Sequence, residues 1–375
     1  MAVDVAKAAG FTVCLMAPTG RAAKHLSDVC GAPGFTMHRA LAIVVKEAED
    51  DDFFADDEAG TIRNKALTEA VEHFNKSEII IADEASMMDT EMASILFKAC
   101  KKKHLMLVGD PNQLPSVGPG RVLGDIMDSS YAQIHGLVTR LTKIFRQAEG
   151  SPVIEAANLV IDGQSPCYVR GVTFLEAENE QVPEMLEKHV VPMLKENKYS
   201  YDEWMVLAPM KKTPYSGVNA LNEFLRPFMN PYYRKPKNEK LDFLYQKGDL
   251  IMQIRNNYEV DIYNGDIGIV QSVDEDGNFE VLFSGDDETV VYEKDEQSQT
   301  QLCNAMSIHK SQGGQADVVV VVLTDSHFVM LNRNLLYTAI TRCSDKLILI
   351  GSKRAYAMAA SNQKENNRMT GLRGI

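Results

Sequence analysis

Several features that define whole classes of protein are missing from this sequence. It has no run of 18 or more apolar residues, so no segment has the length of a membrane-spanning helix. The N-terminus lacks the charged start, the apolar stretch and the small-residue cleavage site of a signal peptide. The six cysteines show no C-x-x-C motif and no Cys/His spacing typical of a metal site. We therefore expect a cytoplasmic protein that has reduced thiols and does not associate with membranes.

The chain also lacks the basic excess that is common in nucleic-acid-binding proteins, because its formal net charge is −13. The acids are concentrated in two stretches. Residues 47–58 carry eight acids and no base, and residues 274–296 carry ten acids and one lysine. Without these stretches the chain has a charge of about +4. A narrow basic track can therefore still bind a polyanion, and we expect the acidic stretches to be solvated loops or insertion faces.

The last absence is the phosphate-cradling motif G-x-x-x-x-G-K-[ST], although other patterns of a nucleotide site are present. The apolar run 79–82 ends in Asp83 and Glu84, which predicts a buried parallel strand that delivers two carboxylates to its carboxyl edge. Mg²⁺ prefers such oxygen ligands, so Asp83 is expected to hold the ion and Glu84 to polarise the water that attacks a γ-phosphoryl group. The alternative is a strand end that runs into a helix cap, with Ser86 or Asp89 as the capping residue.

A second predicted strand, 105–108, ends in Gly109 and Asp110 and is followed by Gln113. An amide side chain can donate to a phosphate oxygen and accept from a water at once. We therefore predict that Gln113 reports whether a γ-phosphate is present and that Asp110 belongs to the same site. The stretch 114–120 is rich in proline and glycine, which predicts a stiff turn.

Arg146 and Arg342 are single arginines bordered by apolar stretches. A dissociative phosphoryl transfer needs a cation that neutralises developing charge, and an arginine finger supplies it. Both arginines lie downstream of the paired carboxylates and fit that role. The alternative for each is an ordinary ion pair with a carboxylate.

Together these motifs resemble the RecD-like DNA helicases of superfamily 1, which move 5′ to 3′ on single-stranded DNA. The resemblance runs from about Phe11 to the C-terminus, and the motifs follow the family order: APTGRAAKHL, TMHRAL, DEASMMD, GDPNQLPSVGPG, LTKIFRQ, VLAPMKKTPYSGVNALN, GDLIMQIRNNY with YNGDIGIV, IHKSQGG and LLYTAITR. It implies ATP and Mg²⁺ as cofactors and single-stranded DNA as partner, with other repair or recombination proteins as candidate partners. It also assigns Gly313 and Gly314 to the nucleotide site.

The sequence departs from the family pattern at its front. In the family a strand, the phosphate loop and a helix precede APTGRAA, whereas residues 1–10 resemble only the later part of that helix. We expect the loop's lysine and threonine to lie outside this chain, so that this polypeptide hydrolyses no ATP by itself.

Predicted strands and helices alternate in two parts of the chain, as in parallel α/β layers. The first part has strands at 12–16, 79–82 and 105–108 and helices at 21–30 and 90–101. The second has strands at 205–208, 318–323 and 346–350 and helices at 216–229, 333–341 and 353–368. Short alternating strands at 249–254, 266–273, 279–283 and 289–292, with turns at Asn264-Gly265 and Asp276-Gly277, predict a small barrel.

The resemblance implies that this α/β protein has two RecA-like parallel-sheet motor domains, with a small SH3-like β-barrel inserted in the second. The predicted divisions are a first motor domain at 1–150, a connecting segment at 151–203, a second motor domain at 204–236 and 301–375, and the barrel at 237–300. Within the first domain, about 44–75 is an insertion whose Glu58 to Asn64 stretch has turn chemistry suited to a short hairpin. Its position resembles that of the family's strand-separating pin, and a plain surface loop is the alternative.

Contacts to DNA are expected at strand ends, where backbone amides and short polar side chains can bind and release phosphates without reading sequence. The residues assigned to this role are Pro18, Thr19, Gly20, Arg21, His38, Asn257, His309, Lys310 and Ser311. For His38 the alternative is a packed side chain. For Asn256, Asn257 and Tyr258 the alternative is closure of a barrel loop.

Two kinds of function remain open. The first is an ATP-dependent 5′ to 3′ DNA helicase recorded without its phosphate loop. The second is a non-hydrolysing remnant or subunit that binds single-stranded DNA. The helicase portion of a conjugative relaxase is an intermediate alternative.

Overall fold

The computed structural model describes residues 2–41, 58–141, 150–235, 245–257, 260, 262–284, 288–363, 368, 370 and 372, with no side-chain description for 58–66. The chain forms two compact units. The first unit comprises Met1–Arg140, Asn256–Asn264 and Asn366–Ile375. The second unit comprises Leu141–Arg255 and Gly265–Glu365. Each unit is described by itself below.

A parallel four-stranded sheet, in the order β2-β1-β3-β4, forms the centre of the first unit. Its strands are β1 (Val13–Ala17), β2 (Gly34–Thr36), β3 (Ile79–Ala82) and β4 (His104–Leu107). The helices are α1 (Ala2–Ala8), α2 (Gly20–Cys30), α3 (Met37–Ala40), α4 (Glu58–Lys76), α5 (Thr90–Ala99), α6 (Val122–Asp128) and α7 (Ser130–Ile134).

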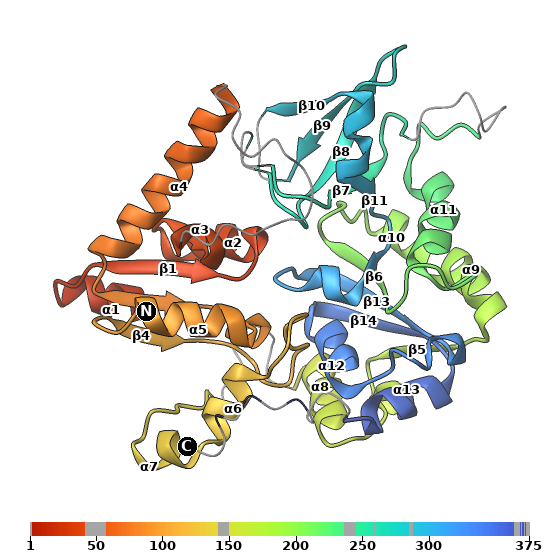
Figure 1. The fold of residues 1–375 in the computed structure, drawn as a ribbon. Helices are drawn as coiled ribbons and strands as arrows, with labels where there is room; N and C mark the ends of the chain where they lie inside the picture. The colour runs from red at the N-terminus through yellow and green to blue at the C-terminus, as the bar shows by residue number, and fades with distance from the viewer. Residues whose placement is uncertain are drawn as a thin grey trace. The chain divides into compact units, whose positions relative to one another are not determined.

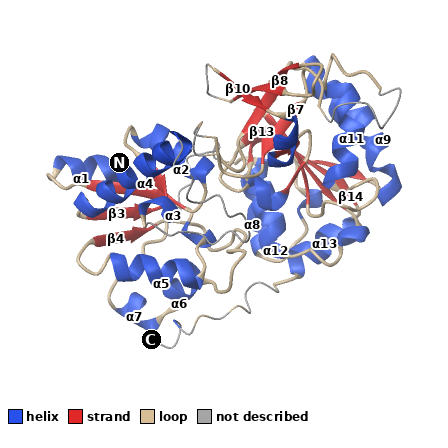
Figure 2. Cartoon of the chain, turned by 45° about the horizontal axis from the view of Figure 1, so that its top comes forward, coloured by secondary structure: helices blue, strands red, loops and turns tan. Residues whose placement is uncertain are grey.

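Helices cover both faces of this sheet (Figure 2). Alternate residues of one strand point to opposite faces. Val13 and Leu15 of β1 therefore pack against α1 and α2, whereas Cys14 and Met16 pack against α3, α4 and α5. β1 is buried throughout, as expected for a parallel strand covered on both sides. β4 lies at one edge of the four described strands, and its Met106 is 46% exposed.

The hairpin predicted at Glu58 to Asn64 is wrong, because these residues begin α4, the long orange helix of Figure 1. Gly60 and Asn64 are the only strong turn formers there, and the sequence that follows is rich in helix formers. Ala70 and Phe74, four residues apart, are both buried, so the later turns have a packed face. Tertiary packing of that face stabilises a helix where local turn chemistry suggested a hairpin. Most of the remaining predicted insertion lies outside the described residues.

The second unit contains a parallel sheet in the order β12-β6-β13-β14-β5. Its strands are β5 (Thr173–Glu176), β6 (Trp204–Ala208), β12 (Met306–Ser307), β13 (Ala316–Leu323) and β14 (Cys343–Gly351). The helices of this unit are α8 (Pro152–Ile161), α9 (Val182–Met185), α10 (Val191–Glu196), α11 (Val218–Met229), α12 (Arg333–Thr341) and α13 (Lys353–Ser361). The predicted connecting segment 151–203 supplies β5, so it belongs to this α/β layer.

An antiparallel sheet in the order β10-β9-β8-β7-β11 also belongs to the second unit. Its strands are β7 (Leu250–Gln253), β8 (Ile267–Val273), β9 (Phe279–Phe283), β10 (Thr289–Tyr292) and β11 (Thr300–Leu302). The turns predicted at Gly265 and Gly277 have φ of 107° and 93°, which favours glycine. β6 precedes the antiparallel strands in the sequence and β12, β13 and β14 follow them, and all four belong to the parallel sheet. The antiparallel sheet is therefore an insertion in an α/β layer.

The predicted strands and helices of both layers are confirmed, most of them with boundaries shifted by one to three residues. The last helix is the largest deviation, because α13 ends at Ser361 and does not continue to Arg368. Among the described residues, no helix is long and apolar enough to cross a membrane.

Candidate functional site

Asp83 and Glu84 follow β3 directly, at the carboxyl edge of the first sheet. The Asp83 amide donates to the Met16 carbonyl on β1 at 2.9 Å, which extends the pairing of the two strands into the loop. The Glu84 amide donates to Asp83 Oδ1 at 2.8 Å. Both carboxylates are half-buried. The strand end thus presents two adjacent acids at a fixed position, as the sequence predicted.

The backbone of Glu84 is in the left-handed region, with φ 49° and ψ 36°. Residues with a side chain avoid this region because Cβ crowds the following carbonyl. Among described non-glycine residues only Lys198 and Tyr215 also have positive φ. Such strain persists where the surroundings enforce it, and it clusters at functional sites. The neighbouring Ala85 amide donates to the Val108 carbonyl at 2.8 Å, so the loop after β3 is held against the end of β4.

The loop after β4 lies against the loop after β3. A Cβ built on Gly109 would be 3.0 Å from the amide nitrogens of both Ala85 and Ser86, so only glycine fits there without displacement. Asp110 Oδ1 accepts from the Asn112 amide at 2.9 Å, and the Asp110 carbonyl accepts from the Gln113 amide at 3.2 Å. The structure therefore brings Asp83, Glu84, Asp110 and Gln113 to the same edge of the sheet, and Gln113 is only 9% exposed.

The alternative interpretation of this strand end also describes part of the structure. Asp89 is the N-cap of α5, and its Oδ1 accepts from the Met92 amide at 2.8 Å. Ser86 does not cap this helix, and within the described part of the chain its buried hydroxyl has no hydrogen-bond partner. The cap is thus six residues beyond Asp83, and neither Asp83 nor Glu84 serves as the capping residue of α5.

The loop that follows Gln113 is held by a segment that the sequence did not point to. Arg368 Nη1 donates to the carbonyls of Ser116 at 2.6 Å and Gly118 at 3.2 Å. Two residues later, the Thr370 amide and hydroxyl donate to Asp125 Oδ2 on α6, at 3.0 and 2.7 Å. Asp125 is fully buried, so these are charge-assisted bonds in a protected setting. We call Arg368, Thr370 and Leu372 the strap.

The residues after β1 that were assigned to DNA already have protein contacts in the first unit. Thr19 is the N-cap of α2, and its hydroxyl accepts from the Ala22 amide at 3.3 Å. A Cβ on Gly20 would lie 2.3 Å from the ring of Tyr263, so the absent side chain is what lets that ring pack there. Tyr263 was missed by the sequence analysis, and its hydroxyl accepts from Arg39 at 2.6 Å. Pro18 and Arg21 are half-buried beside this contact.

His38 and Asn257 each show features of the structural alternative to a DNA contact. His38 lies on α3 and is half-buried, and burial lowers its pKa despite the opposing effect of the Asp89 carboxylate. The Asn257 backbone exchanges two hydrogen bonds with Ile262, at 2.7 and 3.0 Å, and the Asn256 side chain accepts from the Asn264 amide at 3.0 Å. The backbone at Asn257 therefore closes a loop.

In the second unit the structure brings Arg342 and Gly314 together. Arg342, 3% exposed, follows α12 and donates from Nη1 to the Gly314 carbonyl at 3.1 Å and from Nε to the Thr338 carbonyl at 3.3 Å. Gly313, with φ 77°, makes the turn that precedes Gly314. Both of these acceptors are backbone carbonyls, so neither bond is the carboxylate pair that was the alternative for Arg342. Arg146 lies outside the described residues.

His309, Lys310 and Ser311 form a short 3₁₀ turn, Ile308–Ser311, directly after β12. Ser311 is fully buried, and its hydroxyl donates to the Ile308 carbonyl at 2.8 Å. His309 and Lys310 are half-buried. Burial lowers the pKa of Lys310, and the nearby Lys211 ammonium lowers it further. Lys211 was not singled out from the sequence, although it lies in the quoted motif VLAPMKKTPYSGVNALN.

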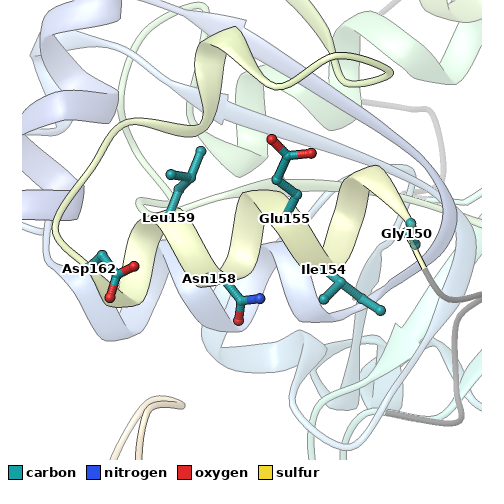
Figure 3. Close-up of a pocket in the computed structure, with 7 residues that line it drawn as sticks. Gly150, Ile154, Glu155, Asn158, Leu159 and Asp162 are labelled. Atoms are coloured by element: carbon teal, nitrogen blue, oxygen red, sulfur yellow. The ribbon is translucent and has the colours of Figure 1, made fainter. Parts of the chain in front are cut away.

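The second unit also contains a pocket. It runs along α8 and is lined by Gly150, Ser151, Ile154, Glu155, Asn158, Leu159 and Asp162 (Figure 3). The lining contains two carboxylates and no basic side chain. An anionic ligand is therefore not favoured there, and no predicted site residue contributes to it.

The acids of the first unit suit a Mg²⁺ ion that takes most of its ligands from phosphates and water. Among the described residues, no three His, Cys, Asp or Glu side chains are grouped so that they could hold a metal ion. Mg²⁺ at a nucleotide needs fewer protein ligands, because phosphates and waters complete its octahedron. The half-exposed Asp83 carboxylate, with one oxygen fixed by the Glu84 amide, fits that requirement.

Three family models match the chain. Residues 1–182 match an AAA domain, residues 221–283 match the ATP-dependent RecD-like DNA helicase SH3 domain, and residues 302–350 match the UvrD-like helicase C-terminal domain. The first range contains the first parallel sheet and β5, the second contains β7, β8 and β9, and the third contains β12, β13 and most of β14.

Curated relatives align along almost the whole chain. An ATP-dependent RecD2 DNA helicase of Deinococcus radiodurans is 32% identical over 367 residues, and a RecBCD enzyme subunit RecD of Mycolicibacterium smegmatis is 27% identical over 392 residues. Each alignment covers 96% of this chain, which spans only 46% of the first relative and 65% of the second.

Solved structures share the fold at low sequence identity. A Pif1 helicase from Candida albicans superposes with a TM-score of 0.53 at 20% identity, covering 96% of this chain and 89% of that one. A Bacteroides Pif1 helicase in complex with ADP-AlF3 and single-stranded DNA gives 0.52 at 18% identity, covering 90% and 82%.

Proposed function

Because the chain belongs to the RecD-like DNA helicases of superfamily 1, we propose that it is the motor part of an ATP-dependent helicase that moves 5′ to 3′ on single-stranded DNA. The observation that carries this proposal is the edge of the first sheet. There a strained acid, its neighbouring acid and a buried glutamine converge from two strand ends. A structural helix cap needs none of these features.

In the proposed site Asp83 holds Mg²⁺, which supplies charge neutralisation on the phosphates. Glu84 accepts a proton from the attacking water or orients it. Gln113 donates to the γ-phosphate oxygen and so distinguishes ATP from ADP. Asp110 fixes the turn that carries Gln113, through the bonds to Asn112 and Gln113 described above.

The arginines have the complementary role of neutralising charge that develops during phosphoryl transfer. Arg342 is the described candidate, beside Gly313 and Gly314, and Arg146 is the second. A guanidinium keeps its charge and has five N–H donors, and the bonds to the Gly314 and Thr338 carbonyls fix its position. Its burial favours a strong interaction, because a partly desolvated charge is screened less.

Single-stranded DNA is the proposed substrate. The contacts proposed for it are Pro18 to Arg21, His38 and Asn257 in the first unit and His309 to Ser311 in the second. These residues lie at strand ends and turns, which suits phosphate binding without sequence preference. We also propose that the protein acts in the cytoplasm, together with repair or recombination proteins.

The 375 residues contain no G-x-x-x-x-G-K-[ST] motif. In phosphoryl transfer, positioning and electrostatic stabilisation supply nearly all of the catalysis, and that loop positions the β- and γ-phosphates. We therefore propose that this polypeptide alone has negligible ATPase activity. The same absence favours one alternative function, a non-hydrolysing single-stranded DNA-binding remnant or subunit. The helicase portion of a conjugative relaxase remains a further alternative.

The test compares ATP hydrolysis, with single-stranded DNA present, by this polypeptide and by a chain extended upstream to include such a loop. We expect turnover only in the extended chain. In that chain Glu84→Gln should abolish turnover and spare nucleotide binding, whereas Asp83→Ala should weaken Mg²⁺-dependent binding itself. An inactive extended chain would favour the remnant, and near-parental turnover by the Glu84 variant would refute the assignment of the general base.

A further inference from the structure

Two lysines of the second unit stand at equivalent positions after neighbouring parallel strands. β6 pairs with β12 in the register Leu207 to Met306 and Ala208 to Ser307. Lys211 is the third residue after Ala208, and Lys310 is the third residue after Ser307. Carboxyl ends of parallel strands meet at one edge of a sheet, so both lysines leave the sheet at the same place.

The strand register places the two lysines on adjacent turns of the sheet edge. Burial lowers the pKa of Lys310, and the Lys211 ammonium lowers it further. Two like charges at short range repel each other, and burial of one increases the cost. An anion bound by both ammonium groups would offset this repulsion, and cations gathered at a protein surface commonly bind an anion.

The turn that carries Lys211 is rigid. The first amides of α11 donate backwards into it: Val218 to the Met210 carbonyl at 2.9 Å and Asn219 to the Lys211 carbonyl at 3.1 Å. A Cβ on Gly217 would lie 2.5 Å from the Thr213 amide nitrogen, so glycine allows the turn to fold against the helix. The backbone of Lys211 is therefore fixed before any ligand binds, which lowers the entropic cost of binding.

A second observation on this turn points to a ligand. Thr213 is only 7% exposed, and its hydroxyl has no hydrogen-bond partner among the residues that the structure describes. A buried hydroxyl without a partner is costly and rare in folded proteins, and a bound ligand or water commonly satisfies it. The turn thus combines an unsatisfied hydroxyl with a cation pair.

We propose that Lys211 and Lys310 together bind one backbone phosphate of single-stranded DNA, with Lys211 as a contact that the family motifs did not assign. The proposal rests on the proposed function, since it names how the second unit holds the strand. Lys310 comes from the turn after β12 and Lys211 from the turn before α11, so the site requires both segments. Ser311, whose hydroxyl is bonded to the Ile308 carbonyl, is not needed in it.

The test measures binding of a fluorescent oligothymidylate to the full chain by anisotropy, at a series of salt concentrations. Lys211→Ala and Lys310→Ala should each weaken binding about tenfold at low salt, as for loss of a charge-assisted bond. Each should reduce the slope of log affinity against log salt by about 0.7, the value for one phosphate of a single strand. Because one phosphate is shared, the double variant should lose little more than either single variant.

Lys212→Ala is the matched control, since Lys212 lies on the same turn, is equally exposed and has the same charge. It should change the affinity less than about twofold. Lys211→Arg should restore most of the binding, which a purely structural role for Lys211 would not require. Circular dichroism melts of all variants establish that the fold is retained.

The outcomes separate the two proposals. A wild-type chain that does not bind the oligonucleotide would overturn the proposed DNA binding and, with it, the lysine site. Wild-type binding with equal effects of Lys211→Ala and Lys212→Ala would overturn the lysine site alone. Displacement of the oligonucleotide by added ATP from wild type and not from Lys211→Ala would assign the pair to nucleotide phosphates, and would also overturn it.

Discussion

The left-handed backbone of Glu84 gives a prediction that separates stability from activity. The comparison is between Glu84→Gly and Glu84→Ala, which remove the same carboxylate. Alanine keeps Cβ and therefore keeps the strain of the left-handed region, about 1–2 kcal/mol. Glycine removes that strain, but it loses more conformational entropy on folding, which lowers the free energy of unfolding by about 0.5–1 kcal/mol. We expect Glu84→Gly to be more stable than Glu84→Ala, by about 0.5–1 kcal/mol.

The assay is chemical denaturation followed by circular dichroism, supported by thermal melts. For a unit of this size the difference corresponds to about 1–4 °C in Tm. Both variants should be inactive in ATP hydrolysis in a chain that carries the phosphate loop, since both lack the proposed base. The strain therefore would be retained for function at a cost to stability.

A matched control is available in α4, where Glu69 is exposed and lies inside the helix. There the order should reverse, with Glu69→Gly less stable than Glu69→Ala by about 1 kcal/mol. If Glu84→Gly is instead equal to or less stable than Glu84→Ala while the control behaves as expected, the left-handed strain at Glu84 is refuted.

Three further predictions concern buried contacts. Burial lowers the pKa of His327 from 6.5 to about 4, so as the pH falls the unfolded chain is protonated before the folded protein. The stabilisation from the neutral imidazole should be fully present above pH 6.5, and the free energy of unfolding should fall by about 3 kcal/mol towards pH 4. Denaturation at several pH values checks this, and His327→Gln should flatten the profile. Gly351→Ala should cost more than about 3 kcal/mol, because its Cβ would lie 1.7 Å from the Leu323 carbonyl oxygen at a φ of 136°. Gly31→Ala, at φ 55° with nothing within 4 Å, should cost only about 1 kcal/mol in the same melts. Thr370→Val should lower the free energy of unfolding by about 1–2 kcal/mol, because the buried Asp125 carboxylate on α6 loses a hydrogen bond. Unchanged stability would show that the strap does not bind α6.

The sequence predicted the parallel layers and the positions of the acids at the sheet edge well, because both depend on local patterns. An apolar run such as 79–82 is typical of a parallel strand covered on both faces, and the residue that follows such a strand lies at the edge of the sheet. The positions of Asp83, Glu84, Asp110 and Gln113 follow from that rule. Turn glycines at 265 and 277 are determined locally in the same way.

The hairpin predicted at Glu58 failed for the opposite reason. Turn-forming residues at Gly60 and Asn64 are a weak local preference, worth a few tenths to about 1 kcal/mol each. The packed face through Ala70 and Phe74 belongs to the first unit's core, and its burial outweighs that preference. Local chemistry could not reveal which of the two would dominate.

By itself, therefore, the sequence determined which strands end in acids, which turns require glycine and which family the ordered motifs resemble. Only the tertiary structure decided which distant segments meet: Tyr263 on Gly20, the strap on the loop after Gln113, and β6 beside β12. The same holds for the left-handed backbone at Glu84, which the bond from Ala85 to the Val108 carbonyl helps to hold. The physical reason is register. Periodicity along one segment fixes its own faces, whereas the pairing and packing of segments far apart in sequence depend on the whole core.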